Sequence, residues 1–183
     1  FETWTVVDKD GAEIEIKQSI HELVFTRDYI LLADTAFVAG TEMFTPWKSA
    51  KLPDKKTVIH IIDRRDLIAG EKTVVSKQVV VDNPCIHLMP EYENPNDQIT
   101  VYMLHTPATN TAELLRSYDR DLNGNLFPKH LTGYGTLPVL DLSSIGKHTI
   151  DVAHAEVKTS EYISEMPYCW GPYLYTYMGR QMQ

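Results

Sequence analysis

The sequence has no cluster of lysine and arginine and no long apolar run. Its formal net charge is −8, from 17 basic and 25 acidic residues in a chain of 183. Nucleic-acid surfaces and surfaces that bind anionic membranes need clustered basic side chains. A membrane-spanning helix needs roughly 20 consecutive apolar residues, and no segment approaches that length. These absences argue against a protein that binds nucleic acid or spans a membrane, and we expect it in the cytoplasm.

Cysteine is scarce, and local metal-binding motifs of histidine are absent. Cys85 and Cys169 are far apart and form no CxxC pair. We expect two buried thiols in a reducing compartment, with one disulfide between them as the alternative. The seven histidines form no HxH, HxxH or HExxH motif. A metal site in this chain must therefore combine strands that are distant in sequence.

Most single histidines have an ordinary structural explanation. His60 stands in an apolar run, which is typical of a core histidine. His105 closes a strand-like run before Thr-Pro, which is an ordinary strand exit. His148 and His154 would lie on the same face of another strand-like run.

Short alternating runs bounded by turn residues dominate the chain and predict an all-β fold. Apolar residues make up 43% and charged residues 23% of the sequence, as in globular proteins. Regular short strands favour a sandwich, barrel or propeller. A hairpin is expected at 3–18 around Asp8–Gly11. Further strands are expected at 29–37, 57–63, 72–82, 85–89, 98–106, 148–159 and 172–179.

One helix and one loop interrupt the predicted strands. Residues 110–122 form the helical candidate, with Asn110 or Thr111 as its cap. Residues 122–147 are rich in Gly, Pro, Asn and Ser and predict a long loop. Strand–helix–strand spacing is absent, which argues against a parallel α/β sheet. We expect a single domain over 1–183.

The segment "DRDLNGN" matches half of a calcium-binding loop. Asp119, Asp121 and Asn123 occupy the odd ligand positions, and Gly124 stands at the turn. The twelfth position is His130, where a bidentate glutamate is required. A polar turn that bonds its own backbone is the favoured interpretation, and a calcium-stabilised β-protein is the remaining alternative.

Three segments, in order, resemble the carotenoid cleavage oxygenases. "IHELVFTRDYILLAD" resembles the segment around the family's second iron-binding histidine, usually His-Asp-Phe-Ala-Ile-Thr. "CIHLMPEYEN" is similar to the segment around the third, and "SEMPYCWGPYLYTYMG" to the Glu-Phe-Pro segment. The chain departs from the family at Pro90-Glu91, where Asn-Ala is usual, and after Pro167. The departures leave the substrate open.

The resemblance implies a metal site and a reaction. The family fold is a seven-bladed β-propeller in which four histidines hold Fe(II). By position, His21 and His87 are two of these ligands, and Glu165 is the carboxylate that supports His87. The reaction would be cleavage by O2 of a conjugated C=C bond in a carotenoid, apocarotenoid or stilbene, giving two carbonyl products.

The first and fourth histidine motifs of the family are not recognisable in this chain. At about 40–50 residues a blade, 183 residues hold roughly four blades. We therefore expect an excerpt of a longer polypeptide, inactive alone, or a chain that associates with another copy; peripheral membrane contact would come from segments outside it. The alternative is a catalytically inactive propeller-type module for binding or assembly.

Overall fold

The computed structural model describes residues 1–35, 37–38, 54, 56–105, 109–110, 117–121, 123–132 and 143–166. These residues are mostly β, which confirms the all-β expectation, and their helical segments are 3-10 turns of three residues: Arg64–Asp66, Pro95–Asp97 and Lys129–Leu131. The helix expected at 110–122 is wrong where the structure describes it, because residue 110 ends a short strand and 117–121 form a turn with a bridge from Arg120 to Leu126. The rest of that segment, and the strand expected at 172–179, lie outside the described residues. Within the described part of the chain, no helix is long and apolar enough to cross a membrane.

The first sheet has five strands in the order β1-β6-β5-β3-β2. In its antiparallel part, β2, β3, β5 and β6 lie side by side in the order of the sequence, and β1 pairs with β6 in parallel. The strands are β1 (Thr5–Val7), β2 (Ser19–Phe25), β3 (Tyr29–Thr35), β5 (Thr57–Asp63) and β6 (Thr73–Val81).

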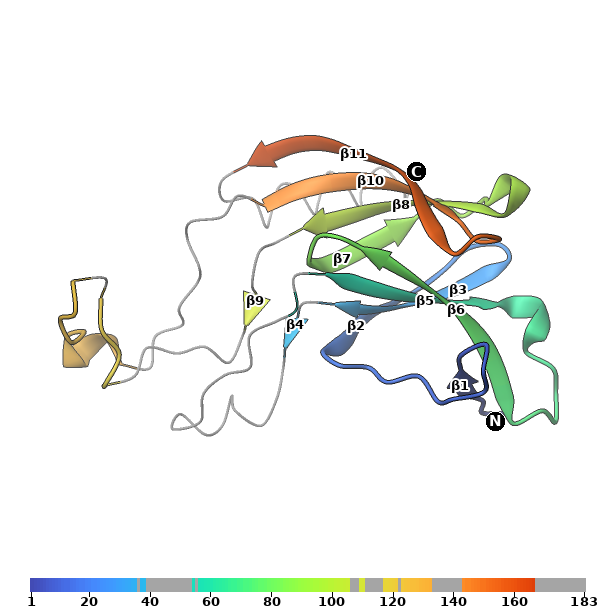
Figure 1. The fold of residues 1–183 in the computed structure, drawn as a ribbon, viewed down its shortest axis with the longest axis horizontal. Coiled ribbons are helices and arrows are strands. Elements are labelled where there is room, and N and C mark those ends of the chain that lie inside the picture. The colour runs from blue at the N-terminus through green and yellow to red at the C-terminus, as the bar shows by residue number, and fades with distance from the viewer. Residues whose placement is uncertain are drawn as a thin grey trace.

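The second sheet is a four-stranded antiparallel meander in the order β11-β10-β8-β7. Its strands are β7 (Cys85–Pro90), β8 (Gln98–His105), β10 (Ser143–Asp151) and β11 (Glu156–Met166). A short parallel pair joins β4 (Phe37–Val38) to β9 (Thr109–Asn110). The two large sheets lie one above the other in Figure 1, with β2 and β7 each at an edge.

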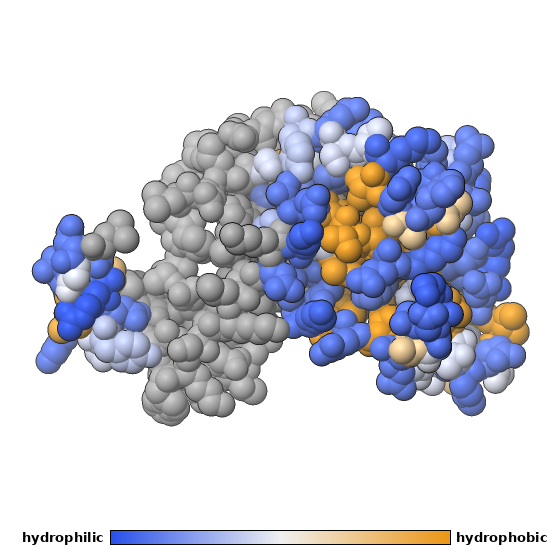
Figure 2. All heavy atoms as spheres, in the orientation of Figure 1, coloured by the Kyte–Doolittle hydropathy of each residue, from blue (hydrophilic) through white to orange (hydrophobic). Residues whose placement is uncertain are grey.

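The core lies between the two sheets and follows the strand period of two. Alternate residues of β3, β5 and β6 meet alternate residues of β7, β8 and β10 in one cluster. Fully burying each large aliphatic side chain contributes about 1.5–3 kcal/mol. In Figure 2, polar side chains cover much of the visible side of the described residues, with an apolar patch between them. The fully buried aliphatic residues of the core include Leu31, Ile59, Ile99, Val101 and Ile150.

The predicted strand boundaries differ most from the structure at two places. The expected strand 148–159 is divided by a turn at 152–155 into β10 and β11. The expected loop 122–147 overlaps β10, which begins at Ser143. The predicted hairpin near the start exists as a tight turn, in which Asp8 accepts the backbone N–H of Ala12 at 2.9 Å. Its second arm is reduced to a single bridge between Val7 and Glu13.

Candidate metal centre

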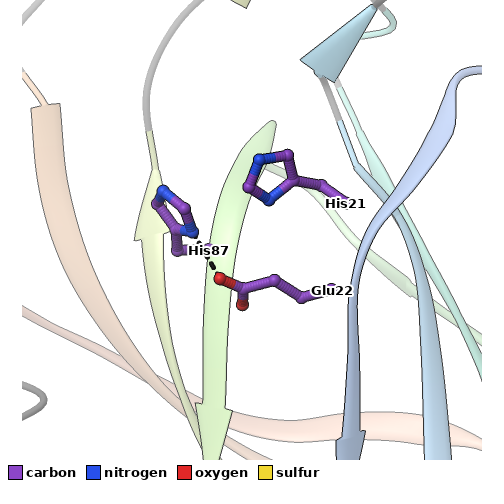
Figure 3. A group of neighbouring side chains, drawn as sticks. All are labelled: His21, Glu22 and His87. Carbon is purple, nitrogen blue, oxygen red and sulfur yellow. Dashed lines mark hydrogen bonds and ion pairs between the residues drawn. The ribbon is translucent and has the colours of Figure 1, made fainter.

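His21 and His87 lie together although 66 residues separate them in sequence. His21 and Glu22 come from β2, and His87 comes from β7 of the other sheet. The two imidazole centroids are 4.9 Å apart, with their planes at 77°. One ligand atom from each of the three residues lies within 4.8 Å of the others. Figure 3 shows the three side chains converging between their strands.

Both strands carry one extra residue at this point. The pairing of β2 with β3 shifts between Ile20 and Leu23, a step that contains His21 and Glu22. The pairing of β7 with β8 shifts between Cys85 and His87. A β-bulge reorients side chains, and in a regular strand two neighbours point to opposite faces. The bulge in β2 therefore explains how His21 and Glu22 both reach His87.

Glu22 fixes the orientation of the His87 ring. Its Oε1 forms a hydrogen bond with His87 Nδ1, and its Oε2 accepts the backbone N–H of Leu88 at 2.8 Å. A carboxylate on Nδ1 keeps the proton on that nitrogen and makes Nε2 the nitrogen for a metal. His21 is exposed, while His87 and Glu22 are half-buried, so solutes can reach the group.

A second contact fixes β2 against β7. The backbone N–H of Arg27 donates to the carbonyl of Tyr92 at 2.8 Å, and the Arg27 guanidinium pairs with Glu93 at 2.7 Å. From His21 to Arg27 is six residues, and from His87 to Tyr92 is five. The two strands thus run in the same direction over similar lengths. The contact at Arg27 therefore fixes the position of β2 along β7, and with it the position of His21 beside His87.

No family model matches the chain, and no curated protein matches it. The assignment of a function therefore depends on the geometry and on the three motif segments.

Glu165 lies on β11, and its backbone pairs with Ser144 of β10. Ser144 pairs with His105, and His105 with Cys85 of β7, so Glu165 and Cys85 stand at opposite ends of one row across the sheet. The side chain of Glu165 is outside the described residues. Its role beside His87 stays a prediction, and the described carboxylate on His87 is Glu22.

The calcium-loop segment uses its polar atoms within the turn. Asp121 Oδ1 accepts the backbone N–H groups of Asn123 and Asn125, each at 2.9 Å. These hydrogen bonds, with Asn125 first, lower the pKa of Asp121. They are the bonds that the polar-turn interpretation predicts. Within the described ranges, Asp119 and Asp121 belong to no group of three histidine, cysteine, aspartate or glutamate residues that could share a metal ion.

A second pair of histidines lies buried at one end of the core. His105 on β8 is 3% exposed and His148 on β10 is fully buried. Their Nε2 atoms are 2.8 Å apart. His105 Nδ1 lies 3.1 Å from the carbonyl of Pro84, and His148 Nδ1 lies 2.9 Å from Ser160 Oγ. No sequence pattern indicates this pair, because each histidine is single in its strand.

The hydrogen-bond partners determine where the protons of this pair lie. Pro84 O can only accept, so His105 carries its proton on Nδ1 and accepts at Nε2. His148 then donates from Nε2 and accepts the Ser160 hydroxyl at Nδ1. Burial lowers the pKa of both rings, that of His105 to about 4. Both histidines are therefore neutral at pH 7.

Gly146 provides the space in which the two rings meet. A Cβ at this position would lie 2.4 Å from His148 Nε2 and 2.7 Å from His105 Nε2. Both distances are far inside van der Waals contact, so only glycine fits beside the pair.

Cys85 is a free, buried thiol, as expected for this cysteine. It donates to the carbonyl of His87 at 2.9 Å, and burial raises its pKa. Cys169 lies outside the described residues.

Proposed function

We propose that His21 and His87 are two ligands of an iron(II) centre in a dioxygenase that cleaves a conjugated C=C bond. One observation carries the proposal. The motif segments assign these two histidines to one metal, and they meet in the structure with ring centroids 4.9 Å apart. Among the described residues, His21, Glu22 and His87 are also the only group of three candidate metal ligands.

The donor set suits iron(II). Neutral imidazoles bind this ion, and positions left open by the protein admit dioxygen. At bond lengths near those of zinc, about 2.1 Å, two nitrogens on one ion lie at most about 4.2 Å apart. One candidate ligand atom from each of His21, Glu22 and His87 lies within 4.8 Å of the others, which is close to that spacing. Bound iron would supply the site where O2 is activated, while Glu22 holds the proton on His87 Nδ1.

The strand order supports a propeller-type arrangement. β2-β3-β5-β6 and β7-β8-β10-β11 are two consecutive antiparallel meanders of four strands, the unit of a propeller blade. Each meander begins with the strand that carries one of the two histidines. The first strands are neighbouring edge strands, as expected if each borders a central channel. A seven-bladed propeller, of which this chain holds part, would place further imidazoles around the same channel.

Metal analysis of the native full-length polypeptide tests this proposal. We expect one iron per chain, lost in His21→Ala and His87→Ala and retained in the matched variant His154→Ala, which changes an exposed histidine. Glu22→Gln should weaken iron binding roughly 10–100-fold, as loss of a supporting carboxylate does. Loss of the conjugated absorbance of a carotenoid or stilbene under O2 would report cleavage.

The alternative is a binding or assembly module that keeps the fold without the chemistry. The described part of the chain supplies two imidazoles to this group, where the family uses four. This alternative expects a folded protein without iron and no effect of the two alanine substitutions. Either result would reject the dioxygenase.

A further inference from the structure

We propose that the chain has a second site, independent of the iron centre, which binds a small organic cation. It is a cavity of about 550 Å³ on the outer face of the first sheet, below the segment 13–18. Val58 and His60 of β5 and Gln78 and Val80 of β6 line it from the sheet side. Its size lies within the range of small-molecule sites, about 300–1,000 Å³.

Specific hydrogen bonds hold the cover of the cavity in place. Asp34 of β3 is 3% exposed, and its carboxylate accepts the backbone N–H groups of Lys17 at 2.7 Å and Gln18 at 2.9 Å. The side chain of Gln18 accepts the backbone N–H of Asp54 at 2.7 Å. The segment 13–18 is thus tied to the sheet on one side and to Asp54 on the other. These bonds hold the cover of the cavity in place.

His60 gives the cavity a buried hydrogen-bonding group. The residue is 5% exposed, and its Nδ1 is the only buried side-chain nitrogen or oxygen without a partner in the part of the chain that the structure describes. An unsatisfied buried polar atom costs about 1–3 kcal/mol. Burial lowers the pKa of His60 more than the nearby Asp34 raises it, so the ring is neutral and offers a lone pair. Because Nδ1 is itself buried, a hydrogen-bond donor of a ligand reaches it only when the ring or a neighbouring side chain turns.

The charge of the lining selects a cation. Among the described residues, five carboxylates and two ammonium groups line the cavity, and carboxylates only accept hydrogen bonds. One of the ammonium groups, that of Lys56, lies 3.2 Å from Asp82, which is not part of the lining. The carboxylates are those of Asp8, Glu13, Glu15, Asp34 and Asp54.

The spacing of the acceptors favours an organic cation over a metal ion. Among the described residues, the only three ligand residues close enough to share one ion are at His21, and none lines this cavity. Ile14, Val58 and Val80 add apolar walls beside the acceptors. An alkylammonium matches both properties, because its charged end donates hydrogen bonds and its chain contacts the apolar residues. The ligand class is therefore a small amine with a short apolar chain.

Calorimetric titration of the native chain with 1,5-diaminopentane tests the site. We expect saturable binding of the diamine and none of 1,5-pentanediol, which has the same length without charge, or of Mg²⁺. Replacing Glu13 and Glu15 together by Gln should weaken binding, by roughly two- to fivefold for each exposed ion pair. The matched double variant Glu2→Gln with Glu71→Gln removes two exposed carboxylates outside the cavity and should bind as the parent does.

His60→Leu should weaken binding at least about tenfold, the value of one hydrogen bond to a charged group. Circular dichroism reports whether this variant folds. If it does not fold, diamine binding by the double variant of the exposed Glu13 and Glu15 tests the proposal instead. The proposal is wrong if the diamine does not saturate by about 10 mM, if the diol binds equally, or if the two double variants behave alike. His21→Ala should leave diamine binding unchanged, so failure of the iron centre and failure of this site are distinguishable.

Discussion

Acidification from pH 6.5 to pH 4.5 should destabilise the folded chain, and His105 should be the main cause. In the folded protein its pKa is about 4, because burial and the neighbouring His148 disfavour the charged ring. In the unfolded chain a histidine titrates near 6.5. Between these values the unfolded chain binds more protons, so the free energy of unfolding falls as the pH falls. This stabilising contribution is complete above pH 6.5 and is lost as the pH approaches 4.

The size of the effect follows from the two pKa values. Each unit of difference corresponds to 1.36 kcal/mol, so His105 contributes about 3 kcal/mol between pH 6.5 and pH 4. That is a large share of a typical unfolding free energy of about 5–15 kcal/mol. Burial lowers the pKa of His60 and His148 as well, and these rings act in the same direction.

Urea unfolding at pH 7, 6, 5 and 4.5 measures the dependence, with EDTA present so that metal binding does not contribute. His105→Gln should lose less stability than the parent over this range, although the variant should be less stable than the parent at pH 7. His154→Gln is the matched control, because His154 is an exposed histidine that keeps the buried pair intact. The reasoning is refuted if the two variants lose stability equally, or if the parent is equally stable at pH 7 and pH 4.5.

Two further substitutions test local packing by denaturant unfolding. Gly146→Ala should destabilise by about 1–3 kcal/mol, because the new methyl group separates His105 from His148; an unchanged midpoint would show that the rings have another arrangement. Thr26→Val should cost about 1–3 kcal/mol, because the buried Thr26 hydroxyl accepts the N–H of Tyr29 at 3.0 Å. Thr26→Ser keeps that hydroxyl and should lose clearly less; equal losses would contradict the hydrogen-bond explanation.

The strands that the sequence predicts well are those whose alternation ends at clear turn residues. Residues 57–63 match β5 to the residue, and the expected 98–106 matches β8 over Gln98–His105, with 106 outside the described residues. The strand expected at 148–159 is wrong because its alternation continues through the turn. That turn contains neither Gly nor Pro; Ala155 has a φ of +55°, and Asp151 accepts the N–H of His154 at 3.1 Å.

The site was predictable only in part. His21 and His87 were found through motif segments, and no local spacing joins them. Glu22 was missed because regular strand alternation would place its side chain on the other face of the strand from His21. The bulge that changes this has no signature in a single sequence. The link between His105 and His148 depends on cross-strand register, which places Ser144 opposite His105 and leaves Gly146 between the two histidines, so that both rings meet beside it. Such pairing is fixed by the folded sheet and has no local signature.

The contact between Arg27 and Tyr92 limits where the sequence of this protein can accept insertions and deletions. A one-residue insertion or deletion between His21 and Arg27 would move His21 by about 3.3 Å and turn it to the other face of its strand. The same holds between His87 and Tyr92. Homologous chains that keep both histidines together should therefore keep these two intervals constant, and length differences should fall elsewhere.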